Sequence, residues 1–254
     1  MTLNKHSDKI TVIAENSTTS PFVIIYKPQG LPSAPLTEND KNCALYQAAQ
    51  FFPEIMNVKG KKNIEAGLVH RIDNVTDGLL LIATTQQSYD VLLKLQEENR
   101  FIKTYNAKCS YLKNLYELKP GFPENLYRNK IPLLKDKEEF KIVLESCFRP
   151  YGPGRKEVRP VIENDTKAAS KKSSNRIYQT EIAVTKDGTD YNVTCKITNG
   201  FRHQVRSHLA WLSIPVKGDP LYNPLSKENE EFFFSATGLE FVNPVNGEKV
   251  KVEI

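Results

Sequence analysis

A carboxylate that stands just before an apolar strand is the first candidate for chemistry in this sequence. Asp73-Asn74 follows His70-Arg71, and the apolar run 78–84 begins soon afterwards. Asp-Asn pairs form turns, whereas an unbroken apolar run is typical of a strand buried on both faces. We therefore expect Asp73 in a loop held against rigid core, a common place for reactive groups. An Asp in such a turn can equally cap backbone N–H groups or pair with Arg71 at the surface.

A second group of polar side chains lies in a predicted helix over Arg202–Leu212. Arg202 and Arg206 are four residues apart and share a face, while the buried stripe is formed by Val205, Leu209 and Leu212. Arginines beside such a stripe can serve a site or simply cover apolar neighbours at the surface. His203 and His208 are five apart, which misses the spacing of zinc ligands on a helix, so we expect no metal site.

Alternating strands and short helices must position these groups. Residues 101–111 alternate and place Lys103, Tyr105 and Ala107 on one face of a strand. The strand 22–26 ends at the turn-forming stretch 27–32. Two helices are predicted, one around 45–52 with Asn42 or Asp40 as N-cap and Pro53 after it, and one over Gln86–Asn99 with Val91, Leu92 and Leu95 inward.

Turn residues also predict two hairpins, one at Lys186–Thr189 and one at Asn246-Gly247. Strands joined by hairpins as well as by helices indicate an α+β fold with a mixed, mainly antiparallel sheet and flanking helices.

Composition places the chain among ordinary globular proteins. It has 254 residues, 39% hydrophobic and 26% charged, and its first twenty residues are polar. We expect a cytoplasmic monomer without a membrane span. The four cysteines form no C-x-x-C pair, which indicates reduced thiols instead of a zinc or disulfide framework.

The positive charge is concentrated in one segment. Residues 146–176 hold eight basic and three acidic side chains, which accounts for the whole net charge of +5. Clustered Lys and Arg with Phe148 and Tyr151 suit a polyanion, because phosphates attract the charges and bases can stack on the rings. A solvated basic loop is the alternative.

Four motifs, in order, resemble those of the RluA family of pseudouridine synthases. The stretch His70-Arg-Ile-Asp73 with Thr76-Asp-Gly-Leu-Leu-Leu81 resembles its H-R-L-D-x-x-T-S-G-L-L-L signature. The other three are Lys27-Pro-Gln-Gly-Leu-Pro32, similar to K-P-x-G-x-x; Lys103-Thr-Tyr-Asn-Ala107, similar to K-x-Y-x-A; and His203-Gln-Val-Arg-Ser-His-Leu209 with Gly218-Asp219 and Tyr222, similar to H-Q-I-R-x-H-L and G-D-x-x-Y.

The resemblance implies the pseudouridine synthase fold with a central cleft, and isomerisation of uridine to pseudouridine in rRNA or tRNA without a cofactor. Asp73 would act as nucleophile at C1′ or as base at the ribose 2′ position, and Arg206 would keep it ionised. Tyr105 would stack on the uracil and act as general base, and Leu209 would pack under the ring. The flipped uridine would also be supported by His70, Arg71, His203 and Gln204.

Contacts with RNA phosphates are expected from basic residues of the turn, the insert and the helix, namely Lys27, Arg149, Arg155, Lys156, Arg159 and Arg202. We expect a catalytic domain over residues 21–254 with a basic insert at about 146–176. Residues 1–20 are expected to form a short polar segment, too short for the S4-like domain of many relatives.

The sequence departs from the family pattern at several positions. Asp77 replaces the usual Ser, Phe201-Arg202 replaces Arg-Thr, and the insert lies outside the core pattern, so the RNA target is open. Two other function classes remain. One is a non-catalytic RNA-binding protein, and the other is a glycosidase-like hydrolase that uses Asp73 and Asp77 as a carboxylate pair.

Overall fold

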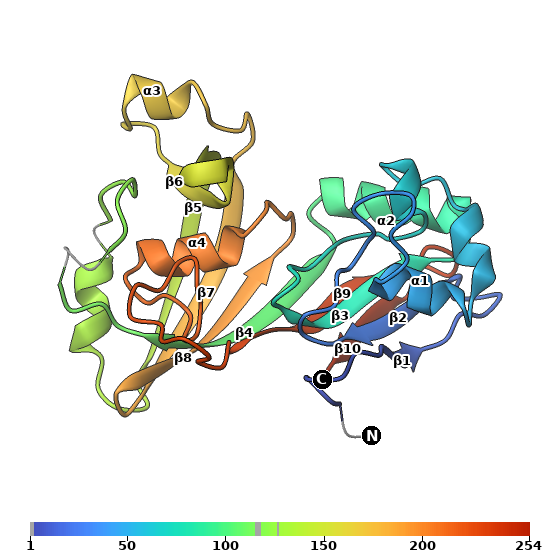
Figure 1. The fold of residues 1–254 in the computed structure, drawn as a ribbon, viewed down its shortest axis with the longest axis horizontal. Helices are drawn as coiled ribbons and strands as arrows, with labels where there is room; N and C mark the ends of the chain where they lie inside the picture. Colours follow the sequence, from blue (N-terminus) through green and yellow to red (C-terminus); the bar gives the residue numbers. More distant parts are fainter. Residues whose placement is uncertain (1–2, 115–117, 126) are drawn as a thin grey trace. The chain divides into compact units, whose positions relative to one another are not determined.

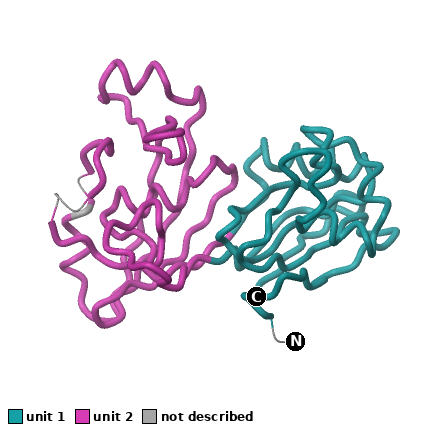
Figure 2. Tube along the Cα trace, viewed as in Figure 1, with its two compact units in different colours: residues 1–103, 235–254 teal, residues 104–234 magenta. Residues whose placement is uncertain are grey.

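The structure is a computed structural model that describes residues 3–114, 118–125 and 127–254. The chain divides into two compact units (Figure 2). Unit 1 comprises residues 1–103 and 235–254, and unit 2 comprises residues 104–234. Both units contain strands and helices, so the predicted α+β class is confirmed.

Unit 1 is built on strands in the order β1-β2-β3-β9-β10 (Figure 1). Their bounds are Thr11–Ala14, Phe22–Lys27, Asp77–Ala83, Phe234–Val242 and Lys249–Glu253. The helices are α1 (Ala44–Ala49) and α2 (Gln86–Glu97), with short 3-10 turns at Pro53–Asn57 and Asn63–Glu65. The segment before residue 21, expected as a polar extension, supplies β1, which pairs antiparallel with β2.

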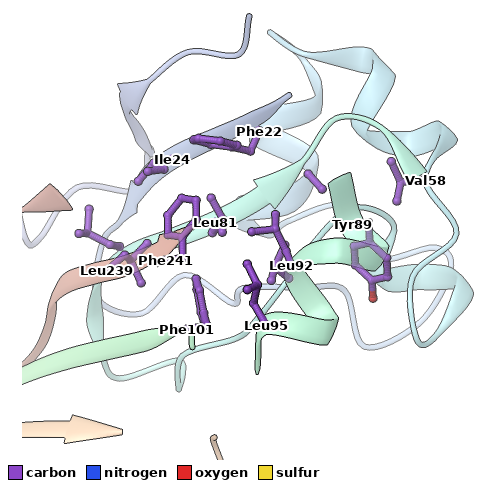
Figure 3. Close-up of a cluster of buried hydrophobic side chains, with 13 residues drawn as sticks. Phe22, Ile24, Val58, Leu81, Tyr89, Leu92, Leu95, Phe101, Leu239 and Phe241 are labelled. Atoms are coloured by element: carbon purple, nitrogen blue, oxygen red, sulfur yellow. The ribbon is translucent and has the colours of Figure 1, made fainter. Parts of the chain in front are cut away.

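The core of unit 1 lies between α2 and the sheet (Figure 3). Tyr89, Leu92 and Leu95 of α2 belong to one buried cluster with Leu81 of β3 and Phe241 of β9. Every residue of β3 is buried, as the apolar run predicted. Because each large apolar side chain contributes about 1.5–3 kcal/mol on burial, β3 is a rigid base for the loop that precedes it.

A glycine is required where β3 meets β9. The two strands pair in parallel at Asp77↔Ser235 and Gly78↔Ala236. Gly78 has φ +130°, and a Cβ there would stand 2.2 Å from the carbonyl oxygen of Ala236. A side chain would therefore force the strands apart directly after the Asp73 loop.

Unit 2 has strands in the order β4-β8-β7-β5-β6. Their bounds are Ile102–Ser110, Asp190–Ile197, Tyr178–Asp187, Glu139–Tyr151 and Glu157–Val161. The helices are α3 (Lys167–Ser170) and α4 (Gln204–Trp211), with 3-10 turns at Arg128–Leu133 and Pro153–Arg155. The face of β4 that carries Lys103, Tyr105 and Ala107 is buried, as the alternation predicted.

Both predicted hairpins are present. β7 and β8 pair down to Asp187↔Asp190 around Gly188, and β9 pairs with β10 around Gly247. The predicted N-cap of α1 is wrong, because Cys43 takes that position without a side-chain bond. No helix in the part of the chain that the structure describes is both long and apolar enough to cross a membrane.

Candidate active site

Asp73 lies in the loop that precedes β3, four residues before the strand begins at Asp77. Its carbonyl accepts the N–H of Thr76 at 3.0 Å, which closes a tight turn over Asn74 and Val75. The neighbours Ile72 and Thr76 are buried, whereas Asp73 is partly exposed. The predicted loop position is confirmed, with a carboxylate at the surface of a turn whose two ends are fixed in the core.

Ser33 fixes the backbone directly before Asp73. Its hydroxyl donates to the carbonyl of Ile72 at 2.8 Å and accepts the N–H of the same residue at 3.2 Å. Ser33 is 5% exposed, so water does not compete for these bonds. Both polar groups of the residue before Asp73 are therefore held by one side chain.

The turn after β2 also binds the backbone that follows Asp73. The N–H of Gly30 donates to the carbonyl of Asn74 at 2.8 Å. The side-chain amide of Gln29 donates to the carbonyl of Val75, also at 2.8 Å. With Ser33, these bonds attach the Asp73 loop to the turn on both sides of the carboxylate.

Lys27 supports the same loop from inside. Its ammonium donates to the carbonyls of Leu31 at 2.7 Å, Pro28 at 2.9 Å and Asn74 at 3.4 Å. The side chain is fully buried, and burial lowers its pKa to about 8 although Asp77 and Asp73 favour the charged form. A buried ammonium that binds three carbonyls does not reach RNA phosphates, so we reassign Lys27 from RNA contact to support of the loop.

His70 and Arg71 occupy different environments. His70 is buried, its Nε2 accepts the N–H of Leu81 at 3.2 Å, and its ring lies 5.5 Å from that of Phe101. Burial, reinforced by Lys103, lowers the pKa of His70 to about 3, so the ring is neutral at physiological pH. Arg71 is exposed, and its guanidinium pairs with Glu65 at 2.8 Å instead of with Asp73.

Asp77 is a structural carboxylate of unit 1. It is the first residue of β3 and is 4% exposed. The hydroxyls of Tyr26 and Ser235 each donate to it at 2.8 Å, one to each carboxylate oxygen. Asp77 therefore joins β2, β3 and β9.

In unit 2, Arg206 forms a buried ion pair that the sequence did not predict. Its Nε and Nη2 donate to the two carboxylate oxygens of Asp219, both at 2.8 Å. Arg206 and Asp219 are 2% and 0% exposed. The pair uses two of the five N–H donors of a guanidinium and fixes the plane of the group. The signal available in the sequence was the Gly218-Asp219 motif, but its spacing from Arg206 does not reveal the pairing.

Asp219 itself is held in place by a tight turn. Its Oδ1 accepts the N–H groups of Leu221 at 2.9 Å and Tyr222 at 3.1 Å. Gly218 has φ +72°, and a Cβ there would stand 2.1 Å from the carbonyl oxygen of Glu231. This turn is the reason that a Gly-Asp pair occurs at these positions.

The helix that carries Arg206 starts later than predicted. α4 begins at Gln204, because His203 has φ +56° and Arg202 lies before the helix. The Gln204 side chain accepts the N–H of Phe201 at 2.9 Å and donates to Thr180 at 3.0 Å. Leu209 is fully buried.

Tyr105 is 7% exposed, and its ring stacks on that of Phe234 with 5.3 Å between the ring centroids. The Nδ1 of His203 lies 3.1 Å from the hydroxyl oxygen of Tyr222. The predicted substrate residues of unit 2 are thus held by protein contacts. Asp73, His70 and Arg71 belong to unit 1, so the predicted ion pair between Arg206 and Asp73 stays a prediction.

The basic insert is partly built into the fold of unit 2. Arg159 is 1% exposed, pairs with Glu157 at 2.7 Å and donates to the carbonyl of Pro120 at 3.0 Å. Its guanidinium carbon also lies 4.3 Å from the ring centroids of Phe122 and Tyr151. Such a guanidinium packs the insert and does not face RNA, so we reassign Arg159.

The remaining insert residues differ in exposure. Arg149 is half-buried, donates to Gly121 at 3.1 Å and lies over Tyr151. Arg155, Lys156 and Arg202 are exposed. Arg202 donates to the carbonyls of Arg155 and Glu157, which ties the turn before β6 to the start of α4.

A family model described as RNA pseudouridylate synthase matches residues 21–211. The chain belongs to this family. The resemblance to RluA-type pseudouridine synthases that the motifs indicated is thereby confirmed. Within the described residues, no group of three or more His, Cys, Asp or Glu side chains is arranged to hold a metal ion.

Relatives and solved structures agree with this membership. The chain is 27% identical to the tRNA pseudouridine(31) synthase of Saccharomyces cerevisiae over 79% of this chain and 44% of the relative. It is 24% identical to the ribosomal large subunit pseudouridine synthase D of Neisseria meningitidis serogroup B over 96% of this chain and 57% of the relative. The chain thus spans about half the length of these relatives.

The fold is shared with two human proteins of known structure. RNA pseudouridylate synthase domain containing 1 matches with a TM-score of 0.64 and 18% identity, over 99% of this chain and 86% of that one. RNA pseudouridylate synthase domain containing 4 matches with a TM-score of 0.56 and 16% identity, over 94% of this chain and 86% of that one. At these identities the likeness concerns the fold alone.

Proposed function

We propose that the protein is an RNA pseudouridine synthase that isomerises uridine in structured RNA. The observation that carries the proposal is the Asp73 loop of a family member: a partly exposed carboxylate between Ile72 and Thr76, both fixed in the core. The relatives named above act on tRNA and on large-subunit rRNA, so both RNA classes are candidate substrates.

The reaction needs a positioned carboxylate and no redox partner. The N1–C1′ bond breaks, a C5–C1′ bond forms, C5 loses its proton and N1 gains one, so atoms and electrons balance without a cofactor. Asp73 acts either as the nucleophile at C1′ or as the base at the ribose 2′ position. The loop bonds from Ser33, Gly30 and Gln29 hold its backbone, so little reorganisation is needed on reaction.

Arg206 and Tyr105 supply the other roles that the family resemblance gives them. Arg206 keeps Asp73 ionised, and Asp219 fixes the orientation of its guanidinium. Tyr105 stacks on the uracil and removes the C5 proton, while Leu209 packs under the ring. The target uridine leaves its stack to be reached, and the exposed Arg71 supports the flipped state.

His70, His203 and Gln204 are assigned supporting roles. His70 is neutral and buried, and the other two side chains have hydrogen-bond partners in unit 2, so we propose that each supports substrate binding through the contacts it makes within its own unit. Arg155, Lys156 and Arg202 are exposed and are proposed to contact RNA phosphates. The half-buried Arg149 is proposed to contribute to the same surface. A cytoplasmic location and a monomeric state stay predictions.

Glycoside hydrolysis is disfavoured by a specific observation. The second carboxylate that this chemistry needs would be Asp77, but both of its oxygens accept bonds from Tyr26 and Ser235 in the core. A non-catalytic RNA-binding protein needs no ordered Asp73 loop.

The test incubates the protein with RNA labelled with tritium at C5 of uridine and then analyses the nucleosides. Release of tritium together with pseudouridine supports the proposal. Free uracil would indicate hydrolysis, and unchanged RNA from every tRNA and rRNA transcript tried would contradict catalysis.

A further inference from the structure

Beyond β6 the chain leaves the sheet of unit 2 as a short arm, residues 162–176, which includes α3 (Figure 1). The arm is closed at its base on β5. The N–H of Ser174 donates to the carbonyl of Phe148 at 2.8 Å, and its hydroxyl accepts the N–H of Phe148 at 3.1 Å. The twelve residues before Ser174 therefore form an excursion with a defined exit and return.

The arm contributes little to the core. Ala169 is its buried residue, at 5% exposed, while the others are half-buried or exposed. Thr166 caps α3 by accepting the N–H of Ala169 at 3.2 Å. The arm is therefore ordered by local bonds, and the positions of its three lysines are not explained by packing.

Four basic side chains of the arm are exposed, and the structure records no ion pair for them in the described part of the chain: Lys167, Lys171, Lys172 and Arg176. Glu163 and Asp165 are the two acidic residues of the arm, and Asp165 accepts the N–H of Thr166 at 2.7 Å. Some exposed lysines outside the arm do have carboxylate partners, as Lys141 has Glu139 at 2.8 Å. Clustered like charges repel one another, and a polyanion relieves that repulsion.

We propose that the arm binds the phosphate backbone of the substrate RNA; this rests on the proposed function. Residues 162–176 contain no aromatic side chain on which a base could stack and four basic ones, so the contact is mainly electrostatic. The short apolar residues offer no face for insertion into a membrane. Lysines act as point charges on phosphate, so the contact adds affinity without reading sequence.

The position of the arm lets it act together with the turn before β6. The register of β5 and β6 pairs Tyr151 with Glu157 at the turn end and Cys147 with Val161 at the arm end. Four residues of strand separate these ends by about 13 Å at about 3.3 Å per residue. One RNA can therefore meet the arm and Arg155-Lys156 at once.

The test compares two variants that lose the same charge. In the arm variant Lys167, Lys171, Lys172 and Arg176 are replaced by Gln. In the control the same change is made at four exposed lysines that have carboxylate partners, Lys94, Lys141, Lys249 and Lys251. Both are made in the full chain that carries Asp73→Asn, so that RNA is bound but not turned over.

The readout is fluorescence anisotropy with a mixed-sequence RNA hairpin between 50 and 200 mM KCl. If each side chain contacts one phosphate, the slope of log affinity against log salt falls by roughly 3, at about 0.7–0.9 per contact. Over this fourfold salt range the parent protein should then lose about 60-fold more affinity than the arm variant. The control should keep most of the parent slope.

An arm variant with the parent slope, or a control that loses as much slope as the arm variant, would overturn the inference. Pseudouridine formation is measured separately in chains that keep Asp73. If RNA binding shows the expected slopes but no pseudouridine forms, the proposed reaction has failed and the RNA contact stands. If pseudouridine forms normally and the slope is unchanged, only the assignment of the arm has failed.

Discussion

Asp219→Asn tests whether the buried pair with Arg206 supports the stability of the fold. The substitution keeps the shape of the side chain and the acceptor for Leu221 and Tyr222, but it places an amide donor opposite the Nε of Arg206. Removing one partner of a buried pair costs about 3–5 kcal/mol, and we expect the lower end because one oxygen is retained. A loss of about 3 kcal/mol lowers the unfolding midpoint by about 6–12 °C in a chain of this length.

Thermal unfolding followed by circular dichroism measures this loss, and Asp187→Asn is the matched control. Asp187 also pairs with a cation, Lys137, but at the surface, so its replacement should leave the midpoint nearly unchanged. The double variant Arg206→Leu with Asp219→Leu should be more stable than Asp219→Leu alone, because it leaves no buried charge behind. A double variant as unstable as the sum of its single changes would refute the reasoning.

Three further predictions concern single side chains. Tyr105→Phe keeps the stack on Phe234, so 5-fluorouridine RNA should still bind while turnover falls steeply; unchanged turnover would restrict Tyr105 to stacking. Ser33→Ala removes both hydrogen bonds to Ile72, so we expect a loss of about 1–3 kcal/mol in the free energy of unfolding and a lower kcat at unchanged RNA affinity. An unchanged kcat would show that Ser33 does not position the loop for catalysis. The pKa of Lys27 is about 8 in the fold against 10.5 for an unburied lysine, so its contribution to stability is present above pH 10.5 and is lost as the pH falls through about 8. In denaturant unfolding, the free energy of unfolding of wild type relative to that of Lys27→Met should therefore rise by up to about 3 kcal/mol between pH 8 and 10.5. A difference that does not change with pH would contradict the lowered pKa.

Patterns that depend on near neighbours predicted the fold well. The apolar run of β3 requires burial on both faces wherever it lies, and the residues around Gly188 and Gly247 form turns for local steric reasons. The Asp73 loop was predicted for the same reason, because turn residues stand directly against a buried strand. The α1 N-cap failed because packing placed Cys43, and not a nearby Asn or Asp, at the helix start.

Roles that depend on distant residues were not visible in the sequence. Lys27 looks like a free surface charge until the turn after β2 closes over it and Asn74 approaches from a loop 47 residues away. Arg159 alternates like an ordinary strand residue, but rings from separate segments enclose it. The pairing of Arg206 with Asp219 depends on the turn at Gly218, which only the folded backbone reveals.

The central claim, that Asp73 carries out uridine isomerisation, is tested most directly by nucleoside analysis of RNA treated with Asp73→Asn. Asp90→Asn, an exposed carboxylate on α2, is the control for loss of charge in unit 1. We predict that wild type and Asp90→Asn form pseudouridine at similar rates, and that Asp73→Asn binds the RNA with unchanged affinity but forms none. Pseudouridine formation by Asp73→Asn within about tenfold of the wild-type rate would contradict the account.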